Sequence, residues 1–300
     1  MELPDSIIEL GEQLDKGSDI APDPELFDAY EVFAVEVARI LTQPWLAVDH
    51  ASRLAADGDY FRAEIGSRSM IVVRESADQI HAMRNACLHA GYRVCEDESG
   101  RTTQLFCQYH GWYYALDGRL TEPVLRPELL DRSRYRLARY AMQIKQGLIL
   151  VDMSKFGPEA PPVRPTDLGA LPDLSDRPVA RRQRYSTTTN WKKLRRFLWD
   201  SPDLAFGGGG CEDIVELGPL SFVANRDGDA VMLRLIPRFP GHTDFEVVEM
   251  PNGGGSVRST SAGDPIGDAL RDNAESIAEM PLDRSFYSWY WSLMSPPAAA

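Results

Sequence analysis

The chain has 300 residues, 43% hydrophobic and 26% charged, which is long enough for one large domain or two ordinary ones. The formal net charge of −13 disfavours nucleic acid as a partner, because nucleic-acid binding needs a basic surface. No stretch approaches the roughly 18 apolar residues of a membrane helix, and no secretory leader is recognisable at the start, so we expect a cytoplasmic protein that does not bind membranes.

The N-terminal region is strongly acidic. Residues 1–28 contain nine carboxylates and one lysine, so we predict that residues 1–22 form a flexible acidic arm. Asp23 and Pro24 then resemble an N-cap followed by proline at the first helical position. Apolar residues recur at helical spacing from there, which predicts an N-terminal helix in the segment 23–44.

The segment 45–153 is predicted to be rich in β-strands. The candidate strands are 60–65, 69–73, 79–85, 103–107, 112–115 and 148–151. Asp117 and Gly118 predict a tight hairpin turn. Six prolines between Phe156 and Pro178 indicate a proline-rich connector over residues 154–184.

The segment 185–295 combines predicted strands and helices. The candidate strands are 185–189, 221–225, 230–236 and 244–249, and the candidate helices are 191–199 and about 264–280. Eight lysines and arginines without any acidic residue lie between Arg177 and Arg196. Both a docking patch for an acidic protein and an ordinary solvated face are compatible with this segment.

Cysteine and histidine occur together in two short motifs inside the β-rich segment. The motifs are Asn85-Ala-Cys87-Leu-His89-Ala-Gly91 and Cys107-Gln-Tyr-His110-Gly-Trp112. A Rieske-type [2Fe–2S] cluster needs two thiolates on one iron and two imidazoles on the other, and each motif supplies one of each. Zinc uses the same residue types, but zinc sites rarely combine these two spacings. The sequence therefore predicts that Cys87, His89, Cys107 and His110 bind a [2Fe–2S] cluster.

These motifs resemble the alpha subunits of the Rieske non-haem iron oxygenases, the aromatic ring-hydroxylating dioxygenase family. Tyr109, Gly111 and Trp112 match the second motif of that family, whereas Ala90 stands where the family usually has arginine. The resemblance covers residues 23–250 and implies an α+β fold, with a Rieske domain at 45–153 and a shortened helix-grip domain at 185–295. The extra cysteine that each loop of the bc-complex type of Rieske protein carries is missing.

The family resemblance also implies a second metal site, which this sequence does not complete. In the family, the helix-grip domain binds a mononuclear Fe(II) through two histidines and one carboxylate. Asn190-Trp191-Lys192 matches the start of the corresponding helix and places Asp200 near a carboxylate that bridges the cluster and the iron of neighbouring subunits. The positions of the two histidines then fall on about Asp203 and Gly208.

The remaining histidines offer little replacement for that pair. His50 and His81 lie in the first half of the chain, and His242 is the only histidine of the second half. We therefore expect that the mononuclear Fe(II) is not bound by this chain. The acidic residues of the late helix are expected to be capping and surface residues; these are Asp264, Asp268, Asp272 and Glu275.

The resemblance implies an oxidoreductase component and leaves three functions open. The favoured function is a Rieske subunit of a hetero-oligomeric ring, which accepts electrons from a ferredoxin or flavin reductase. Such a subunit passes them to an iron-bearing oxygenase subunit, with Asp200 as an electron bridge, or supports the ring structurally. The alternatives are a complete oxygenase with an atypical iron site and an electron carrier of ferredoxin type. The sequence does not identify the substrate.

Overall fold

The computed structural model describes residues 3–15, 24–42, 45–124, 131, 134–163, 168–202, 210–254, 268, 272–273, 277 and 284–294. The chain divides into two compact units, one formed by Pro44–Val179 and the other by Met1–Gln43 together with Ala180–Ala300. Taken together, the described residues of the two units form α-helices and antiparallel sheets, and the predicted α+β class is confirmed.

The unit 44–179 contains a seven-stranded antiparallel sheet. Its order is β1 (Leu46–His50), β10 (Leu148–Gly157), β9 (Arg139–Lys145), β4 (Gln79–Arg84), β3 (Arg68–Ser76), β2 (Asp59–Ile65) and β5 (Ser99–Arg101). A 3-10 turn, η2 (Ala51–Leu54), follows β1. In β2, Phe61, Ala63 and Ile65 are buried while Arg62 and Glu64 are partly exposed, the period-two alternation that predicts a strand.

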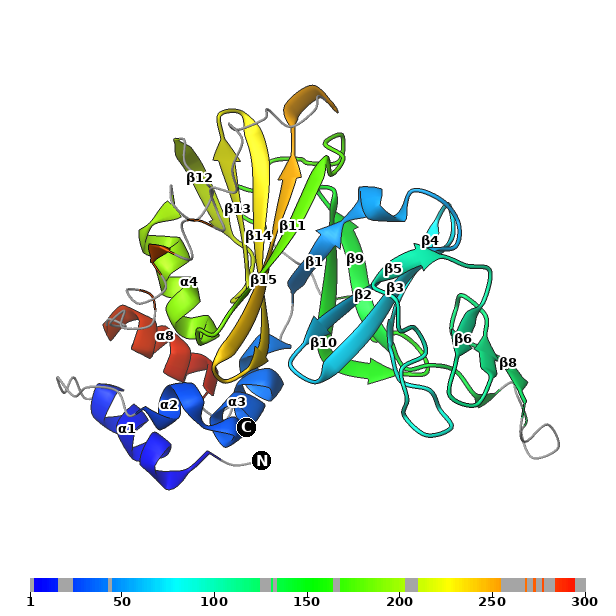
Figure 1. Cartoon of the computed structure of the whole chain (residues 1–300), viewed down its shortest axis with the longest axis horizontal. Coiled ribbons are helices and arrows are strands. Elements are labelled where there is room, and N and C mark those ends of the chain that lie inside the picture. The colour runs from blue at the N-terminus through cyan, green and yellow to red at the C-terminus, as the bar shows by residue number, and fades with distance from the viewer. Residues whose placement is uncertain are drawn as a thin grey trace. The chain divides into compact units, whose positions relative to one another are not determined.

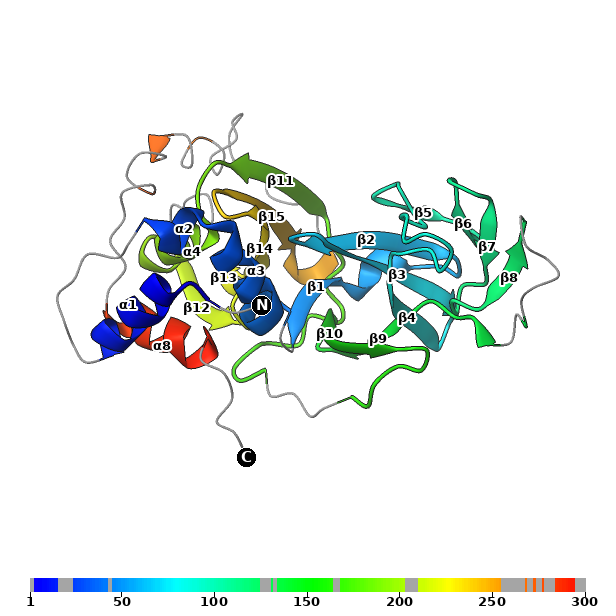
Figure 2. The ribbon, with the colours of Figure 1, turned by 90° about the horizontal axis from the view of Figure 1, so that it is seen from below.

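A second, three-stranded sheet of this unit consists of β6 (Leu105–Cys107), β7 (Trp112–Tyr114) and β8 (Leu120–Pro123) (Figure 2). The predicted turn at Asp117 and Gly118 lies between β7 and β8 and is confirmed. Gly118 has a φ of +88°, which favours glycine, and its N–H donates to the carbonyl of Ala115 at 2.9 Å. Side chains from both sheets form one core, in which Ile71, Val73 and Met83 pack with Cys87 and Tyr114.

The other unit contains a five-stranded antiparallel sheet with helices (Figure 1). The strand order is β11 (Arg181–Thr187), β15 (His242–Met250), β14 (Asp229–Phe239), β13 (Ser221–Arg226) and β12 (Cys211–Glu216). The helices are α1 (Asp5–Asp15), α2 (Glu25–Asp28), α3 (Tyr30–Glu36), the π-turn η1 (Val37–Leu41), α4 (Trp191–Asp200) and α8 (Arg284–Met294), with a short 3-10 turn, η4 (Asn252–Gly254). The predicted helix 191–199 is confirmed, and the N-terminal helix is interrupted at Ala29, whose backbone is extended.

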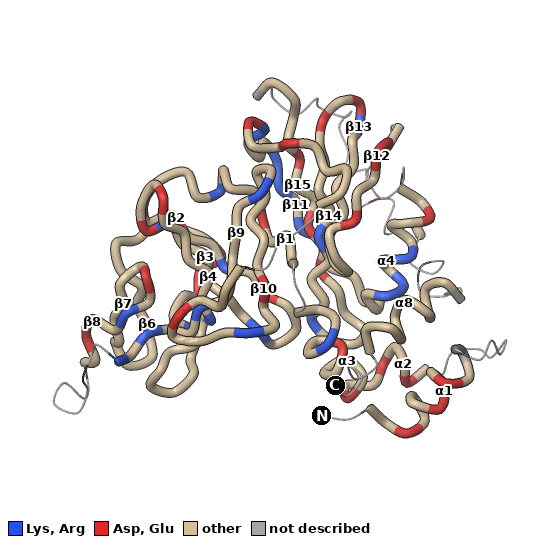
Figure 3. Tube along the Cα trace, turned by 180° about the vertical axis from the view of Figure 1, so that it is seen from behind, with Lys and Arg blue, Asp and Glu red and all other residues tan. Residues whose placement is uncertain are grey.

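The prediction of a flexible arm at 1–22 is wrong for residues 5–15, which form α1. Ile7, Leu10 and Gly11 follow helical spacing on one side of α1, and all three are buried. A Cβ atom on Gly11 would lie 2.9 Å from the ring of Trp291, so α1 packs closely against α8. The carboxylates of α1 occupy the positions away from this buried side (Figure 3). Their high density favoured the interpretation as a mobile arm over that as an amphipathic helix.

A buried carboxylate, Glu36, connects three helices of this unit. Its two oxygens accept hydrogen bonds from Trp191 Nε1 at 2.8 Å, from Lys192 Nζ at 2.6 Å and from the Tyr290 hydroxyl at 2.7 Å. These donors lie on α4 and α8, and Glu36 ends α3. Burial lowers the pKa of Lys192 and the Glu36 carboxylate opposes that shift, so the ammonium depends on its partner.

Most basic side chains of the segment 177–196 form ion pairs inside their own unit. Glu246, which is fully buried on β15, contacts Arg182, Arg184 and Arg234. Burial on its own would raise the pKa of Glu246, but the three guanidinium groups hold it well below its usual range. Arg195 likewise pairs with Glu216. Much of the positive charge of this segment is therefore compensated by carboxylates of the same unit.

Two predictions fall mainly outside the described residues. The segment 264–280, predicted as a helix, is described only at isolated positions, and so are its candidate acidic residues.

In the described part of the chain, no helix combines the length and the apolar character needed to cross a membrane.

Candidate metal centre

Two loops of the unit 44–179 carry the predicted cluster ligands. Cys87 follows β4 and Cys107 ends β6. Both loops close in the same way, because Gly91 N–H donates to the Cys87 carbonyl at 2.8 Å and Gly111 N–H donates to the Cys107 carbonyl at 2.9 Å. The two glycines have φ angles of +74° and +71°, a backbone conformation that side chains disfavour, which explains why glycine occupies both positions.

The two loops bring all four predicted ligands together. The Nδ1 atoms of His89 and His110 face one another at 3.0 Å, and the buried side chains of Cys87 and Cys107 are in hydrogen-bond contact. Two ring nitrogens this close need a shared proton or a cation between them. Two nitrogens bound to one metal at about 2.1 Å lie about 3 Å apart, so the imidazole pair has the spacing of two ligands on a single metal.

The donor set therefore fits a [2Fe–2S] cluster. A nitrogen pair and a sulfur pair suit one iron each, and the bound cluster would supply one-electron transfer. Among the described residues, no group of three or more His, Cys, Asp or Glu side chains surrounds a single ion position. A binuclear centre with two protein donors per iron does not require such a group.

Tyr114, which the sequence analysis did not single out, is a neighbour of the candidate ligands. Its hydroxyl lies 3.1 Å from Cys87 Sγ and accepts the backbone N–H of Leu88 at 3.1 Å. Burial, followed by contact with Cys87, raises the pKa of Tyr114, so the hydroxyl stays protonated and can donate to the sulfur. Its inward position on β7, two residues after buried Trp112, is the sequence signal that could have identified it.

Replacing Tyr114 with phenylalanine is expected to lower the reduction potential of the cluster while leaving it assembled. A hydrogen bond to a ligand sulfur stabilises the reduced state by withdrawing charge. A net value of about 0.5–1.5 kcal/mol corresponds to about 20–65 mV for a one-electron couple. Protein-film voltammetry would measure the shift, with Tyr113→Phe as the matched control on the same strand. An unchanged potential in Tyr114→Phe would show that the hydroxyl does not interact with the bound cluster.

Asn85 fixes the first loop through both ends of its side chain. Its Oδ1 accepts the N–H groups of Val94 and Cys95 at 2.8 and 2.9 Å, and its Nδ2 donates to the Cys95 carbonyl at 2.8 Å and to Ser69 Oγ at 3.1 Å. These bonds tie the start of the loop to its end. Burial raises the pKa of Cys95 to about 12, so this cysteine is a neutral packing residue.

Aromatic rings surround the two histidines at the loop tips. Tyr92 of the first loop stacks on Tyr109 of the second at 3.6 Å between ring centroids, and Trp112 stacks on His89 at 5.1 Å. Tyr92 and Tyr109 are 48% and 53% exposed, and Leu88 and Phe106 are also exposed. The histidine end of the candidate centre is therefore bordered by an exposed apolar rim, which consists of Leu88, Tyr92 and Tyr109.

The other predicted site residues lie elsewhere. Asp200 ends α4, is exposed and pairs with Arg196 one turn earlier. Asp203 and Gly208 lie outside the described residues. The remaining histidines belong to other local structures: His50 Nε2 is 3.0 Å from the Leu174 carbonyl, His81 lies between Glu75 and Arg139, and His242 is 3.3 Å from Asp244.

The fold and the two-loop donor set define a Rieske-type iron–sulfur domain. In agreement, residues 44–131 match the family model described as "Rieske [2Fe-2S] domain". Relatives found by sequence are named as alpha subunits of a demethylase and of a dioxygenase, and a solved structure of similar fold is named as a Rieske monooxygenase. The chain therefore contains a Rieske [2Fe–2S] domain and is similar to alpha subunits of oxygenases, as the resemblance predicts.

Two curated relatives illustrate the sequence similarity. The N,N-dimethyl phenylurea N-demethylase subunit alpha of Sphingobium sp. is 34% identical over 159 residues, which are 51% of this chain and 34% of the relative. The glycine betaine monooxygenase oxygenase subunit of Chromohalobacter salexigens is 39% identical over 105 residues, 35% of this chain and 23% of the relative. The matched part thus covers about a quarter to a third of these relatives.

Solved structures share the fold over a longer part of the chain. The quaternary ammonium Rieske monooxygenase CntA superposes with a TM-score of 0.67 at 17% identity, covering 98% of this chain and 90% of that chain. Naphthalene 1,2-dioxygenase from Rhodococcus sp. superposes with a TM-score of 0.65 at 19% identity, covering 95% and 88%. Both units of this chain therefore follow the fold of these oxygenases.

Proposed function

We propose that this chain is the Rieske subunit of a multicomponent, hetero-oligomeric oxygenase. In this function the chain accepts electrons from a ferredoxin or a flavin reductase and delivers them to a mononuclear non-haem iron held by a partner subunit. Cys87, His89, Cys107 and His110 would hold the [2Fe–2S] cluster that supplies one-electron transfer. In a second form of the same proposal, the chain transfers no electrons and only supports the ring structurally.

The distribution of histidines carries this proposal. A mononuclear site of the family type needs two histidines near the helices and sheet of the unit formed by residues 1–43 and 180–300. That part of the sequence contains one histidine, His242, on β15 next to Asp244. The residues present do not fit a two-histidine iron site, whereas the donors of the cluster domain are complete.

The surface around the candidate cluster favours contact with an electron-transfer partner protein. The apolar rim at the loop tips leaves hydrophobic side chains exposed next to His89 and His110. Exposed apolar residues around a functional centre favour contact with another protein. Both a reductant and an iron-bearing subunit have to approach the cluster closely, so this rim is the expected contact.

Metal analysis of the purified chain tests the proposal. We expect two irons and two acid-labile sulfides per chain after anaerobic preparation, and no substrate-dependent oxygen uptake until an iron-bearing subunit is added. A third iron together with oxygen uptake by the isolated chain would establish the alternative of a complete oxygenase. A fragment of residues 44–179 that served the partner as well as the whole chain would instead indicate a carrier of ferredoxin type.

Replacing Asp200 with asparagine is expected to slow electron transfer to the partner subunit and to leave the cluster intact. Its exposed pair with Arg196 contributes only about 0.3–0.5 kcal/mol, so the fold should tolerate the change. Rapid mixing of the reduced chain with the iron-bearing subunit would measure the rate, and Glu212→Gln on β12 is the control. Equal rates in both variants would remove Asp200 from the route.

A further inference from the structure

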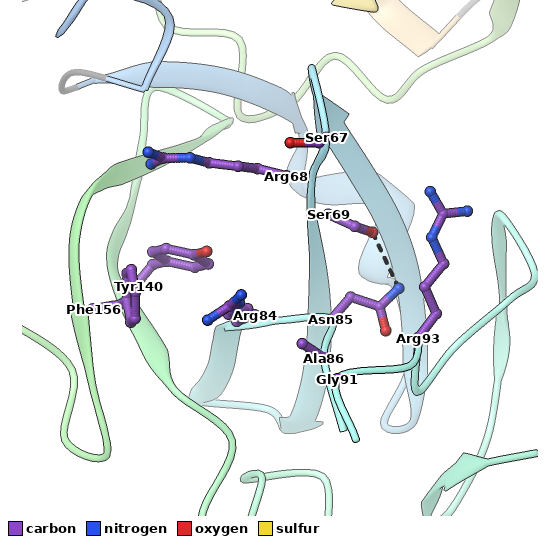
Figure 4. A pocket seen from close by; sticks show the side chains of 10 residues that line it. All are labelled: Ser67, Arg68, Ser69, Arg84, Asn85, Ala86, Gly91, Arg93, Tyr140 and Phe156. Carbon is purple, nitrogen blue, oxygen red and sulfur yellow. Dashed lines mark hydrogen bonds between the residues drawn. The ribbon is translucent and has the colours of Figure 1, made fainter. Parts of the chain in front are cut away.

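A cavity of about 460 Å³ lies beside the first cluster loop in the unit 44–179 (Figure 4). Residues at the start of β3, at the end of β4 and in the loop that follows form one side, and Tyr140 on β9 and Phe156 on β10 form the other. Its volume falls within the range of about 300–1,000 Å³ that is usual for small-molecule sites. None of the candidate cluster ligands lines it.

The lining of this cavity is positively charged. It includes Arg68, Arg84 and Arg93 and contains no aspartate or glutamate. Arg93 also forms an ion pair with Glu64 at 2.8 Å. Three guanidinium groups around one space are notable in a chain with a net charge of −13. Guanidinium groups bind carboxylates and phosphates through paired hydrogen bonds.

Tyr140 adds a neutral donor to the two arginines. The residue is 3% exposed, and its hydroxyl points into the space between Arg68 and Arg84 (Figure 4). Burial raises the pKa of Tyr140 and the positive charges of Arg68 and Arg84 oppose the shift, so the hydroxyl remains protonated and can donate. The guanidinium of Arg84 lies over the ring of Phe156 at 5.6 Å from its centroid, which restrains its orientation.

We propose that this cavity binds a small free oxyanion, a carboxylate or a phosphate, through Arg68, Arg84 and the Tyr140 hydroxyl. Two charged donors and one neutral donor from three different strands converge on one space, an arrangement that suits an anionic group with several acceptor oxygens. The concave shape favours a small ligand over the flat surface of a protein. This site is separate from the proposed electron-transfer function and does not depend on it.

Isothermal titration calorimetry of the full chain with inorganic phosphate and with succinate tests the proposal. We expect at least one of the two anions to bind at a single site, and the stronger of the two identifies phosphate or carboxylate as the ligand group. Arg84→Gln and Arg68→Gln should each weaken binding about tenfold or more, because each removes a charged hydrogen bond. Tyr140→Phe should weaken it several-fold.

Arg101→Gln is the matched control, since Arg101 is exposed on β5 of the same sheet and outside the cavity. Its affinity should equal that of the unchanged chain. Arg84 is also exposed, so its replacement should not disturb folding, and the visible spectrum of the cluster checks this. If Arg68→Gln did not fold, Arg84→Gln and Tyr140→Phe would still decide the question.

Three results would overturn the proposal. The first is that neither phosphate nor succinate binds. The second is that the anion binds Arg84→Gln and Tyr140→Phe as tightly as it binds Arg101→Gln. The third is binding of a hexaglutamate peptide, abolished by Arg84→Gln, without binding of either small anion. That result would make the cavity a docking point for an acidic protein segment.

Discussion

Replacing His110 with alanine is expected to abolish the visible absorption and the low-temperature resonance of the cluster. His110 Nδ1 and His89 Nδ1 face one another at 3.0 Å, the spacing of two nitrogens on one metal. Removing either imidazole leaves an iron without one of its protein ligands. Acid-labile sulfide should fall from two per chain to nearly none, since an incompletely held cluster is lost during purification.

His242→Ala is the control for this prediction. His242 is partly exposed on β15, near Asp244, and belongs to the other unit. The His242→Ala variant should retain the full spectrum and sulfide content. The comparison distinguishes the effect of removing a cluster ligand from the effect of removing any histidine. A normal spectrum in His110→Ala would disprove the four-residue donor set.

Replacing Lys192 with methionine is expected to destabilise the unit that contains α3, α4 and α8 by about 3–5 kcal/mol. Methionine preserves much of the packing volume, but it leaves Glu36 as a buried charge without its ammonium partner. Folded domains are stable by only about 5–15 kcal/mol, so this loss is a large part of the total. Urea unfolding followed by tryptophan fluorescence would measure it, because Trp191 belongs to the same cluster.

A double variant and a neighbouring lysine make this prediction specific. Adding Glu36→Gln to Lys192→Met should recover part of the lost stability, because the uncompensated charge is removed while Trp191 and Tyr290 keep an acceptor. Lys193→Met, at a partly exposed position one residue later, should cost far less. Equal urea midpoints for Lys192→Met and Lys193→Met would show that the buried ion pair does not hold the helices together.

The candidate metal centre could be predicted from sequence because its ligands are concentrated in two short motifs. Cys87 and His89, like Cys107 and His110, are near one another along the chain, and the glycines that close their loops are adjacent as well. Tyr114 was missed because its role depends on contact with Cys87, 27 residues away, and its position on β7 indicates only that its side chain points inward. The stacking of Tyr92 on Tyr109 joins two loops for the same reason.

The fold was predicted best where strands are buried in long continuous runs. The strands β13, β14 and β15 are buried over most of their length, and they lie close to their predicted positions. The N-terminal segment was predicted wrongly, since its acidic composition outweighed the apolar spacing of Ile7 and Leu10. The strand β1 was also missed, because five consecutive buried residues that include Asp49 and His50 do not resemble a strand pattern.

The cluster around Glu36 has a consequence for the order in which the chain can fold during synthesis. Pro44–Val179 is continuous in sequence and can close its own core as soon as it has left the ribosome. Glu36 is made much earlier, yet its partner Tyr290 is made more than two hundred residues later, at a separation of 254. The helices before Gln43 therefore remain incompletely buried during synthesis until α8 has been made. During this interval they are most accessible to chaperones and proteases.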